Sequence, residues 1–171
     1  MKSRILALLR ESDGVVSGSA ICARLGTSRV AVWKHIQKLQ EMGYAIESGP
    51  KGYRIGSSPD RLHPWEFPGR EDRMVYLPET PSTMDVAKDL ARRGCPAFTV
   101  VVAGRQTRGR GRMGRVWGSG EGGLYFTVVL RPRLPALWSS RVNFLVALTL
   151  ADVLREEYGV DAGLKWPHDI L

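Results

Sequence analysis

The sequence has little cysteine and lacks any long apolar run. Cys22 and Cys95 are the only cysteines among 171 residues, too few for a metal cluster or a disulfide framework, so we expect two buried thiols. No apolar stretch approaches the roughly 20 residues that span a bilayer, and the N-terminus has no signal-peptide cleavage site. These absences exclude membrane insertion and predict a cytoplasmic protein.

The sequence also has fewer acidic than basic residues. The chain has 17 Asp and Glu against 25 Lys and Arg, which gives a formal net charge of +8. Its 43% apolar and 25% charged residues are ordinary for a globular protein and exclude a disordered tail or a fibrous repeat. Residues 1–58 carry a net charge of +5, and five arginines fall between positions 105 and 115. Two separate basic regions predict two separate anionic ligands.

The first 57 residues have the pattern of a winged helix. Apolar spacing predicts helices over residues 4–11, 20–25 and 28–42. Ser17 or Ser19 can cap the second helix, Gly26 ends it, and Thr27 or Ser28 can cap the third. Residues 44–46 and 53–55 alternate like short strands around a turn rich in Gly and Pro. We therefore predict a winged helix-turn-helix domain over residues 1–57 and a linker over residues 58–70.

Residues 71–171 are predicted to form an α+β domain with a mixed sheet. Strands are expected over residues 74–77, 98–103 and 124–130, with Pro78 opening the loop that follows the first. Helices are expected over residues 84–93 and 140–158. The chain stops on an apolar pair just after a segment that begins a strand, so we expect it to be the front portion of a longer protein.

The second helix of a helix-turn-helix places its first turn in the major groove of DNA. Arg and Gln side chains can read base edges there, and a lysine at the wing tip is placed for a phosphate contact. The alternative is a solvated basic helix face. We expect Trp33 to be partly packed and His35 to face solvent. The candidate DNA-binding residues are Ser28, Arg29, Val30, Lys34, Gln37 and Lys51.

The second basic region is the Arg/Gly loop, residues 104–123. It contains the string G-x-G-x-x-G from Gly109, but a dinucleotide site needs that string to open a helix, whereas more glycines and a strand follow here. Alternating Arg and Gly predicts a mobile loop that wraps an anion with guanidinium and backbone N–H groups. A second nucleic-acid contact and a solvated loop are the alternatives.

Several motifs together resemble one family, the winged-helix biotin protein ligases that also act as biotin-operon repressors. The matching segments are residues 49–53, 82–83, 106, 109–117 and 165–169. The resemblance runs over essentially the whole chain. It implies that residues 71–171 are part of a biotin/lipoate ligase domain, which is similar to class II aminoacyl-tRNA synthetases.

The resemblance also implies an activity. Biotin and ATP form biotinyl-5′-AMP, which either passes biotin to a lysine of the biotin carboxyl carrier protein of acetyl-CoA carboxylase or acts as corepressor on operator DNA. Mg²⁺ accompanies ATP, and the protein itself holds no metal. The expected partners are the carrier protein, operator DNA and a second copy of the chain, with no membrane.

The same resemblance implies roles for individual residues. The catalytic residues would be Arg110, Arg112, Lys165 and Asp169. The biotin-binding residues would be Ser82, Thr83, Met84, Gln106, Arg110, Gly111 and Arg112. The nucleotide would be bound by Arg112, Trp117 and Asp169.

The sequence departs from the family pattern in three places. Met84 and His168 stand where the family usually has Asn, and the family's catalytic lysine and glycine-rich strand follow the position of Leu171. We therefore expect the intact protein to be a ligase and these 171 residues alone to adenylate biotin poorly. Two other readings stay open. One is a non-catalytic winged-helix regulator that at most senses biotin. The other is a relative of the lipoate ligases, although the winged helix and the Arg/Gly loop favour biotin over lipoate.

Overall fold

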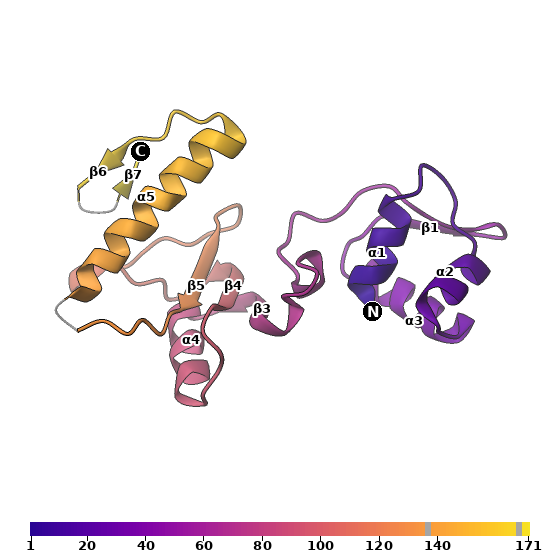
Figure 1. Ribbon diagram of the computed structural model, residues 1–171, viewed down its shortest axis with the longest axis horizontal. Helices are drawn as coiled ribbons and strands as arrows, with labels where there is room; N and C mark the ends of the chain where they lie inside the picture. The colour runs from indigo at the N-terminus through magenta and orange to yellow at the C-terminus, as the bar shows by residue number, and fades with distance from the viewer. Residues whose placement is uncertain (136–137, 167–168) are drawn as a thin grey trace. The chain divides into compact units, whose positions relative to one another are not determined.

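The computed structural model describes residues 1–135, 138–166 and 169–171, apart from the side chains of Arg112, Ser139 and Ser140. The chain divides into two compact units, Met1–Leu130 and Arg131–Leu171. The order of helices and strands is shown in Figure 1. None of the described helices combines the length and the apolarity that a membrane crossing requires.

Three helices open the first unit: α1 (Lys2–Arg10), α2 (Gly18–Leu25) and α3 (Arg29–Glu41). The Ser17 hydroxyl caps α2 by accepting from the backbone N–H of Ala20 at 3.1 Å, and the Ser28 hydroxyl caps α3 by accepting from that of Ala31 at 3.2 Å. Gly26 ends α2 in the left-handed conformation, with φ 62° and ψ 42°. The predicted helix-turn-helix is therefore confirmed together with its caps.

The core between these helices is aliphatic. Each side chain in it is almost completely removed from water, and fully burying one Leu or Ile contributes about 1.5–3 kcal/mol. The helices are thus held by their apolar faces rather than by local helix propensity, since isolated helices of this length are marginal in water. The largest buried side chains are Ile5, Leu6, Leu9, Ile21, Val32, Ile36 and Leu39.

The wing is an antiparallel hairpin of β1 (Ile46–Gly49) and β2 (Gly52–Ile55). Its first strand starts later than predicted because Tyr44 still belongs to the turn that ends α3, its N–H donating to the Leu39 carbonyl at 3.1 Å. Val16, just before α2, exchanges two backbone hydrogen bonds with Tyr53, at 2.8 and 2.9 Å. The wing is therefore attached to the helix-turn-helix by backbone as well as by side chains.

The segment predicted as a linker contributes a short turn, η1 (Pro64–Glu66), that packs on the winged helix. Glu66 accepts hydrogen bonds from Arg10, at 2.8 and 3.0 Å, and from the Tyr44 hydroxyl. That hydroxyl accepts in turn from the Trp65 indole N–H at 2.8 Å. Burial alone would raise the pKa of Glu66, but the hydrogen bonds from Arg10 and Tyr44 lower it. The carboxylate is thus held ionised between its two donors.

A second turn, η2 (Glu71–Arg73), leads into a three-stranded mixed sheet. The first strand, β3 (Met74–Thr80), runs parallel to β4 (Thr99–Gln106), and β4 pairs antiparallel with β5 (Tyr125–Val129). One helix, α4 (Thr83–Arg92), packs on one face through Ala87, against Val101 and Val129. The predicted α+β fold with a mixed sheet is confirmed.

Two strands of this sheet, β3 and β4, continue three residues past their predicted ends. β3 continues through Pro78 to Thr80, because β3 pairs only with β4 in the described sheet and proline is tolerated on an edge strand. β4 extends to Gln106, three residues beyond its predicted end, since its pairing with β3 persists to Thr80. The end of β4 therefore lies beside the end of β3.

Cys22 and Cys95 are half-buried rather than buried. Cys22 packs at the edge of the winged-helix core, and Cys95 packs beside the smaller core under α4. The prediction of fully buried thiols was wrong because both side chains lie at the margins of their cores.

The second unit consists of a long helix and a short hairpin. The helix, α5 (Ser139–Tyr158), ends at Gly159 in the left-handed conformation. The strands β6 (Leu164–Lys165) and β7 (Asp169–Ile170) pair antiparallel. The Phe144 and Trp166 rings meet at a centroid distance of 5.7 Å, which joins the hairpin to the helix.

We expect Gly52→Ala to destabilise the winged helix by about 1–3 kcal/mol. Gly52 has φ +138°, and a Cβ there would lie 2.1 Å from the Val16 carbonyl oxygen, across the backbone bridge that holds the wing. Thermal unfolding followed by circular dichroism measures the effect. The matched control is Gly49→Ala in the same hairpin, where a Cβ meets nothing within 4 Å. Equal melting temperatures for the two variants would contradict the argument.

Candidate functional site

A group of buried polar side chains lies where β3 and β4 end and α4 begins. Gln106, the last residue of β4, accepts two hydrogen bonds at its Oε1 atom from Thr83, the first residue of α4. The Thr83 backbone N–H donates at 2.9 Å and its hydroxyl at 3.1 Å. The side chain of Gln106 thus satisfies a backbone donor that a helix N-terminus leaves open.

The hydrogen bonds continue on both sides of this pair. On one side the Thr83 hydroxyl lies 2.9 Å from the Thr127 hydroxyl of β5. On the other side Gln106 Nε2 donates to the Ser119 hydroxyl at 3.1 Å, and Ser119 donates to the Trp117 carbonyl at 3.2 Å. The result is one chain, called the amide–hydroxyl chain below, formed by Thr127, Thr83, Gln106, Ser119 and the Trp117 carbonyl.

Burial makes this chain costly to leave unpaired. Thr83 is 4% exposed and Ser119 6%, and a buried polar group without a hydrogen bond costs about 1–3 kcal/mol. Ser82, the residue before α4, is buried as well, yet its hydroxyl makes no capping hydrogen bond. Its side chain is therefore not committed to the helix end.

Sequence reasoning found Ser82, Thr83 and Gln106 and missed Thr127 and Ser119. Thr127 carried a weak signal, because it is the one aliphatic hydroxyl in the aliphatic and aromatic run of residues 124–130. Ser119 carried none, because it stands in a glycine-rich stretch where a serine is unremarkable. Only the return of the Arg/Gly loop toward β4 brings Ser119 to Gln106.

The Arg/Gly loop folds back on itself. Backbone hydrogen bonds close it in steps: the Gln106 N–H donates to the Ser119 carbonyl at 3.2 Å, the Trp117 N–H to the Gly109 carbonyl at 2.9 Å, and the Gly111 N–H to the Arg115 carbonyl at 2.8 Å. Its tip is a turn over Arg112–Gly114, where Met113 is 94% exposed. The predicted loop that wraps a ligand is, in this structure, a narrow hairpin whose backbone groups pair with one another.

Gly109 shows why the loop needs glycine at its base. A Cβ on Gly109 would lie 2.4 Å from the Trp117 carbonyl oxygen and 2.5 Å from the Ser119 hydroxyl. The two strands of the hairpin therefore cross more closely than any side chain allows. In the string that resembles a dinucleotide motif, the first glycine, Gly109, therefore serves this crossing.

The arginines of the loop differ in their surroundings. Arg110 forms an ion pair with Asp85, in the first turn of α4, and Arg105 forms one with Glu79 of β3. Asp85 was not predicted as a site residue. An anionic ligand that binds Arg110 has to compete with the Asp85 carboxylate. The side chain of Arg112, predicted to bind biotin and nucleotide, lies outside the described residues.

Three other predicted residues are placed as follows. Met84 follows Thr83 on α4 and is substantially exposed, and Trp117 exposes much of its ring although its carbonyl ends the amide–hydroxyl chain. Gly111 pairs through its backbone N–H with Arg115. The Arg/Gly loop therefore carries an apolar ring and a basic group at its surface, beside the buried chain.

Lys165 and Asp169 belong to the second unit and stand opposite each other in the β6–β7 hairpin. Both are exposed. His168, which replaces the asparagine usual in the resembling family, lies outside the described residues. The pairing shows that Lys165 and Asp169 lie together, as neighbours across two strands.

The winged helix presents the other candidate site. Ser28 is used as the α3 cap, while Arg29, Val30 and Lys34 are exposed along the first turns of α3. Gln37 donates to the Gln40 side chain at 3.1 Å, and Gln40 donates to the Ile46 carbonyl at the start of the wing. Gln37 is therefore part of a side-chain link between α3 and the wing, and its side chain is not free to contact DNA bases.

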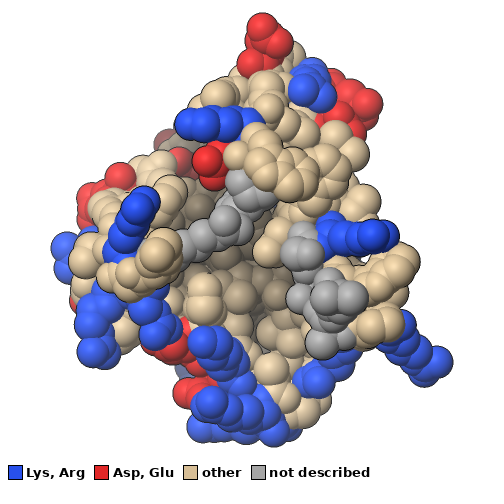
Figure 2. Space-filling model, turned by 90° about the vertical axis from the view of Figure 1, so that its left-hand side faces the viewer, with Lys and Arg blue, Asp and Glu red and all other residues tan. Residues whose placement is uncertain are grey.

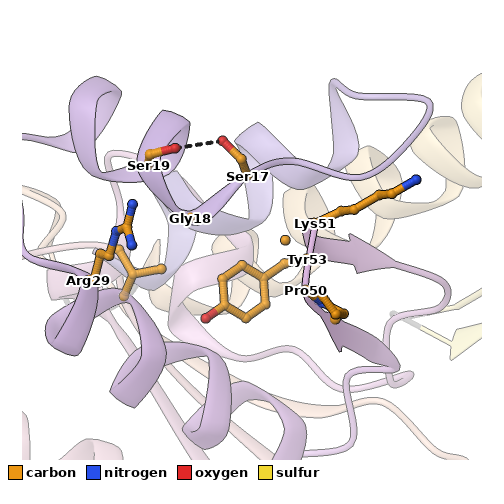
Figure 3. Close-up of a pocket in the computed structure, with 10 residues that line it drawn as sticks. Ser17, Gly18, Ser19, Arg29, Pro50, Lys51 and Tyr53 are labelled. Atoms are coloured by element: carbon orange, nitrogen blue, oxygen red, sulfur yellow. Dashed lines mark hydrogen bonds between the residues drawn. The ribbon is translucent and has the colours of Figure 1, made fainter.

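A cavity of about 250 Å³ opens between the start of α2, the start of α3 and the wing tip. Figure 3 shows Arg29 on one side, the Tyr53 ring on the other, and the Ser17 and Ser19 hydroxyls joined above them. These hydroxyls are 3.0 Å apart. Lys51 extends outward at the wing tip (Figure 3). A basic, hydroxyl-lined cavity at a helix N-terminus suits a phosphate group.

One side chain of α3, His35, differs from expectation. His35 is half-buried rather than in solvent, and its Nδ1 atom has no hydrogen-bond partner among the described residues. Burial and the charges of Lys2, the terminal amino group and Lys38 lower its pKa. His35 is half-buried because it flanks the apolar stripe of α3 that faces the core. Trp33 points away from that stripe and is 52% exposed.

Basic side chains also dominate elsewhere on the surface. Figure 2 shows Lys and Arg side chains gathered along the lower part of one face. A surplus of positive charge steers anionic partners toward a protein. Together, the fold and the two sites define a winged-helix protein with an α+β part that carries linked hydroxyl and amide groups beside a folded Arg/Gly loop.

Comparison with known proteins identifies that class more closely. An HTH domain model matches residues 2–54, and the model of the biotin/lipoate A/B protein ligase family matches residues 76–171. The second match covers more than half of the chain, so the chain belongs to the biotin/lipoate A/B protein ligase family.

Curated relatives share both parts. The bifunctional ligase/repressor BirA of Bacillus subtilis is 38% identical over 164 residues, covering 91% of this chain and 50% of that protein. The bifunctional ligase/repressor BirA of Escherichia coli is 29% identical over 171 residues, covering 98% and 53%. The biotin protein ligase from Aquifex aeolicus in complex with biotin and ATP matches with 37% identity and a TM-score of 0.49, covering 57% of this chain and 40% of that one. The chain spans about half the length of the curated relatives that it matches.

We expect Gly109→Ala to open the base of the Arg/Gly loop. The added Cβ would displace the Trp117 carbonyl and the Ser119 hydroxyl, so the hydrogen bond from Trp117 N–H to the Gly109 carbonyl should weaken. Hydrogen exchange measured by NMR should show faster exchange of the Trp117 amide. Gly120→Ala is the control in the same loop, since a Cβ there meets nothing within 4 Å. Unchanged exchange in Gly109→Ala would contradict the hairpin geometry.

Proposed function

We propose that the protein is an ATP-dependent biotin protein ligase that also binds operator DNA as a repressor. The observation that carries the proposal is the amide–hydroxyl chain at the base of the Arg/Gly loop, in a member of the biotin/lipoate ligase family with a winged helix. The relatives named bifunctional ligase/repressor, which match both parts of the chain, support the combination of roles.

Biotin would bind at the amide–hydroxyl chain. Its ureido ring carries one carbonyl acceptor and two N–H donors, all of which need partners when buried. Ser82 and Thr83, which are buried, and Gln106, which is half-buried, offer hydroxyl and amide groups of both kinds. Met84, in place of the usual asparagine, would add an apolar contact instead of a hydrogen bond. Gly111 would contribute backbone at the edge of the same site.

The first chemical step would form biotinyl-5′-AMP. A carboxylate oxygen of biotin attacks the α-phosphorus of ATP, a new P–O bond forms, and the bond to pyrophosphate breaks. Both reactants are anions, so a cation at their meeting point stabilises the transition state. Arg110 would supply that charge after exchanging Asp85 for the ligand, and Arg112 would act beside it.

By the family resemblance, the nucleotide would be bound by Arg112, Trp117 and Asp169, and Lys165 would act in catalysis. Trp117 offers an exposed ring for packing, and Lys165 and Asp169 offer an ammonium and a carboxylate from one hairpin. No group of three or more His, Cys, Asp or Glu side chains that could hold a metal occurs in the described parts of the chain. Mg²⁺ would enter as the counter-ion of ATP, because Mg²⁺ is usually bound through substrate phosphates and water.

The second step would transfer biotin to protein. The amine of a lysine on the biotin carboxyl carrier protein attacks the acyl carbon, an amide bond forms, and AMP leaves. Because an acyl-adenylate hydrolyses readily, a loop that closes over it has a clear purpose. The Arg/Gly loop would take that role by rearranging from the paired hairpin seen here.

The repressor role would use biotinyl-5′-AMP as corepressor and a homodimer on a palindromic operator, since protein and site symmetry match. The first turns of α3 would enter the major groove with Arg29, Val30 and Lys34. The cavity beside Arg29 and the wing lysine, Lys51, would take backbone phosphates. Ser28 and Gln37 would act mainly by holding α3, given their hydrogen bonds within the domain.

Biotin binding tests the ligase half. Calorimetric titration should show binding by the parent chain and binding about ten- to a hundredfold weaker in Arg110→Ala, the effect of losing a hydrogen bond to a charged group. Arg92→Ala is the control, because Arg92 is another exposed arginine paired with an aspartate of α4. Mass spectrometry with ATP and Mg²⁺ then detects biotinyl-5′-AMP. A parent chain that binds no biotin would contradict the proposal, and abundant adenylate would contradict the expectation that these 171 residues alone adenylate biotin poorly.

DNA binding tests the repressor half. A duplex selected from a random library by the parent chain, with biotin and ATP, serves as the probe for gel-shift titrations over a range of salt. Arg29→Ala combined with Lys34→Ala should weaken binding, and Lys51→Ala should lower the salt slope by about one, as expected for a lost phosphate contact. Lys88→Ala on α4 is the control, exposed but outside the winged helix. Parent-like binding by both test variants would show that α3 and the wing are not the DNA surface.

A further inference from the structure

The amide–hydroxyl chain has one direction, which follows from a backbone group. The Thr83 N–H can only donate, so the atom of Gln106 that faces it must be the amide oxygen. The same oxygen accepts the Thr83 hydroxyl proton. Thr83 has then given its proton away, and the contact with Thr127 requires the Thr127 hydroxyl to donate.

The other half of the chain points the same way. With its oxygen toward Thr83, Gln106 turns its NH₂ group toward Ser119. Ser119 gives its proton to the Trp117 carbonyl, which can only accept, so its oxygen is free to accept from Gln106. Every proton in the chain is therefore donated in the order Thr127, Thr83, Gln106, Ser119, Trp117.

We propose that Thr127 and Ser119 are positioning residues that set which donors and acceptors the site offers to a ligand. Ser119 engages one N–H of Gln106, so a single N–H remains without a partner among the described residues. Thr127 supplies a proton to Thr83, so the Thr83 oxygen keeps one lone pair. One donor beside one acceptor matches the C=O and adjacent N–H of a cyclic urea, an inference that rests on the proposed binding of biotin.

The arrangement makes a specific demand on the ligand. A cyclic guanidinium in place of the urea presents only N–H donors, and one of these would face the remaining N–H of Gln106. Such an analogue should bind much more weakly than the urea. Without the Thr127 hydroxyl, the Thr83 oxygen gains a second free lone pair. Without the Ser119 hydroxyl, the Gln106 amide is held by Thr83 alone. In either case the site should tolerate a ligand with additional N–H donors better.

The test compares two ligands on the full chain. Calorimetric titration with biotin and with 2-iminobiotin, at neutral pH where the guanidine is protonated, gives an affinity ratio for the parent and each variant. Thr127→Val and Ser119→Ala should lower the ratio of biotin to 2-iminobiotin affinity by about tenfold, the factor associated with one hydrogen bond. Thr127→Ser keeps the hydroxyl and should restore the parent ratio.

The ratio separates positioning from damage. A substitution that only loosens the fold should weaken the binding of both ligands and leave the ratio of their affinities unchanged. Parent-like ratios in Thr127→Val and Ser119→Ala would overturn this inference and leave biotin binding intact. If Thr127→Val does not fold, Ser119→Ala, which lies in the Arg/Gly loop, decides the question. A parent chain that binds no biotin would overturn the proposed function, and this inference with it.

Discussion

The hydrogen bond from the Thr83 backbone N–H to the Gln106 side chain joins the two chain segments on which the candidate ligand site depends. It satisfies an open donor at the start of α4, and it sets the orientation of the amide at the end of β4. Thr127, Ser119 and the Trp117 carbonyl take their hydrogen-bond directions from it. These hydrogen bonds thereby connect the base of the Arg/Gly loop to β4, α4 and β5.

The winged helix depends on a comparable union of distant segments. The bridge between Val16 and Tyr53 holds the wing beside α2, and the cavity with Arg29 lies next to that bridge. Glu66, from the segment that leads to the sheet, anchors to Arg10 and Tyr44. The winged helix and the sheet part have separate cores within one compact unit. The turn η1, in the segment between them, packs on the winged-helix core.

Local chemistry made much of the fold predictable. Ser17 and Ser28 cap their helices because a serine oxygen reaches the backbone N–H three residues on, and Gly26 ends α2 because glycine tolerates a positive φ. Predictions went wrong where a neighbour decided the outcome. Pro78 stays within β3 because that strand lies at the edge of the described sheet, and His35 is half-buried because it lies beside the core stripe of α3.

The amino-acid sequence by itself determined the helix-turn-helix, the wing, the mixed sheet and the residue types of the candidate site, including Thr83 and Gln106. The helices, wing and strands follow from spacing, caps and turn residues, which act over a few residues, and the site residues follow from the resemblance of short motifs to one family. Tertiary structure alone decided that Ser119 and Thr127 meet the same pair, that Asp85 holds Arg110, and that the Arg/Gly loop closes on itself. The contacts of Ser119 with Gln106, of Thr127 with Thr83 and of Asp85 with Arg110 join residues more than ten positions apart. Only the pairing of strands and the packing of α4 bring them within hydrogen-bond distance.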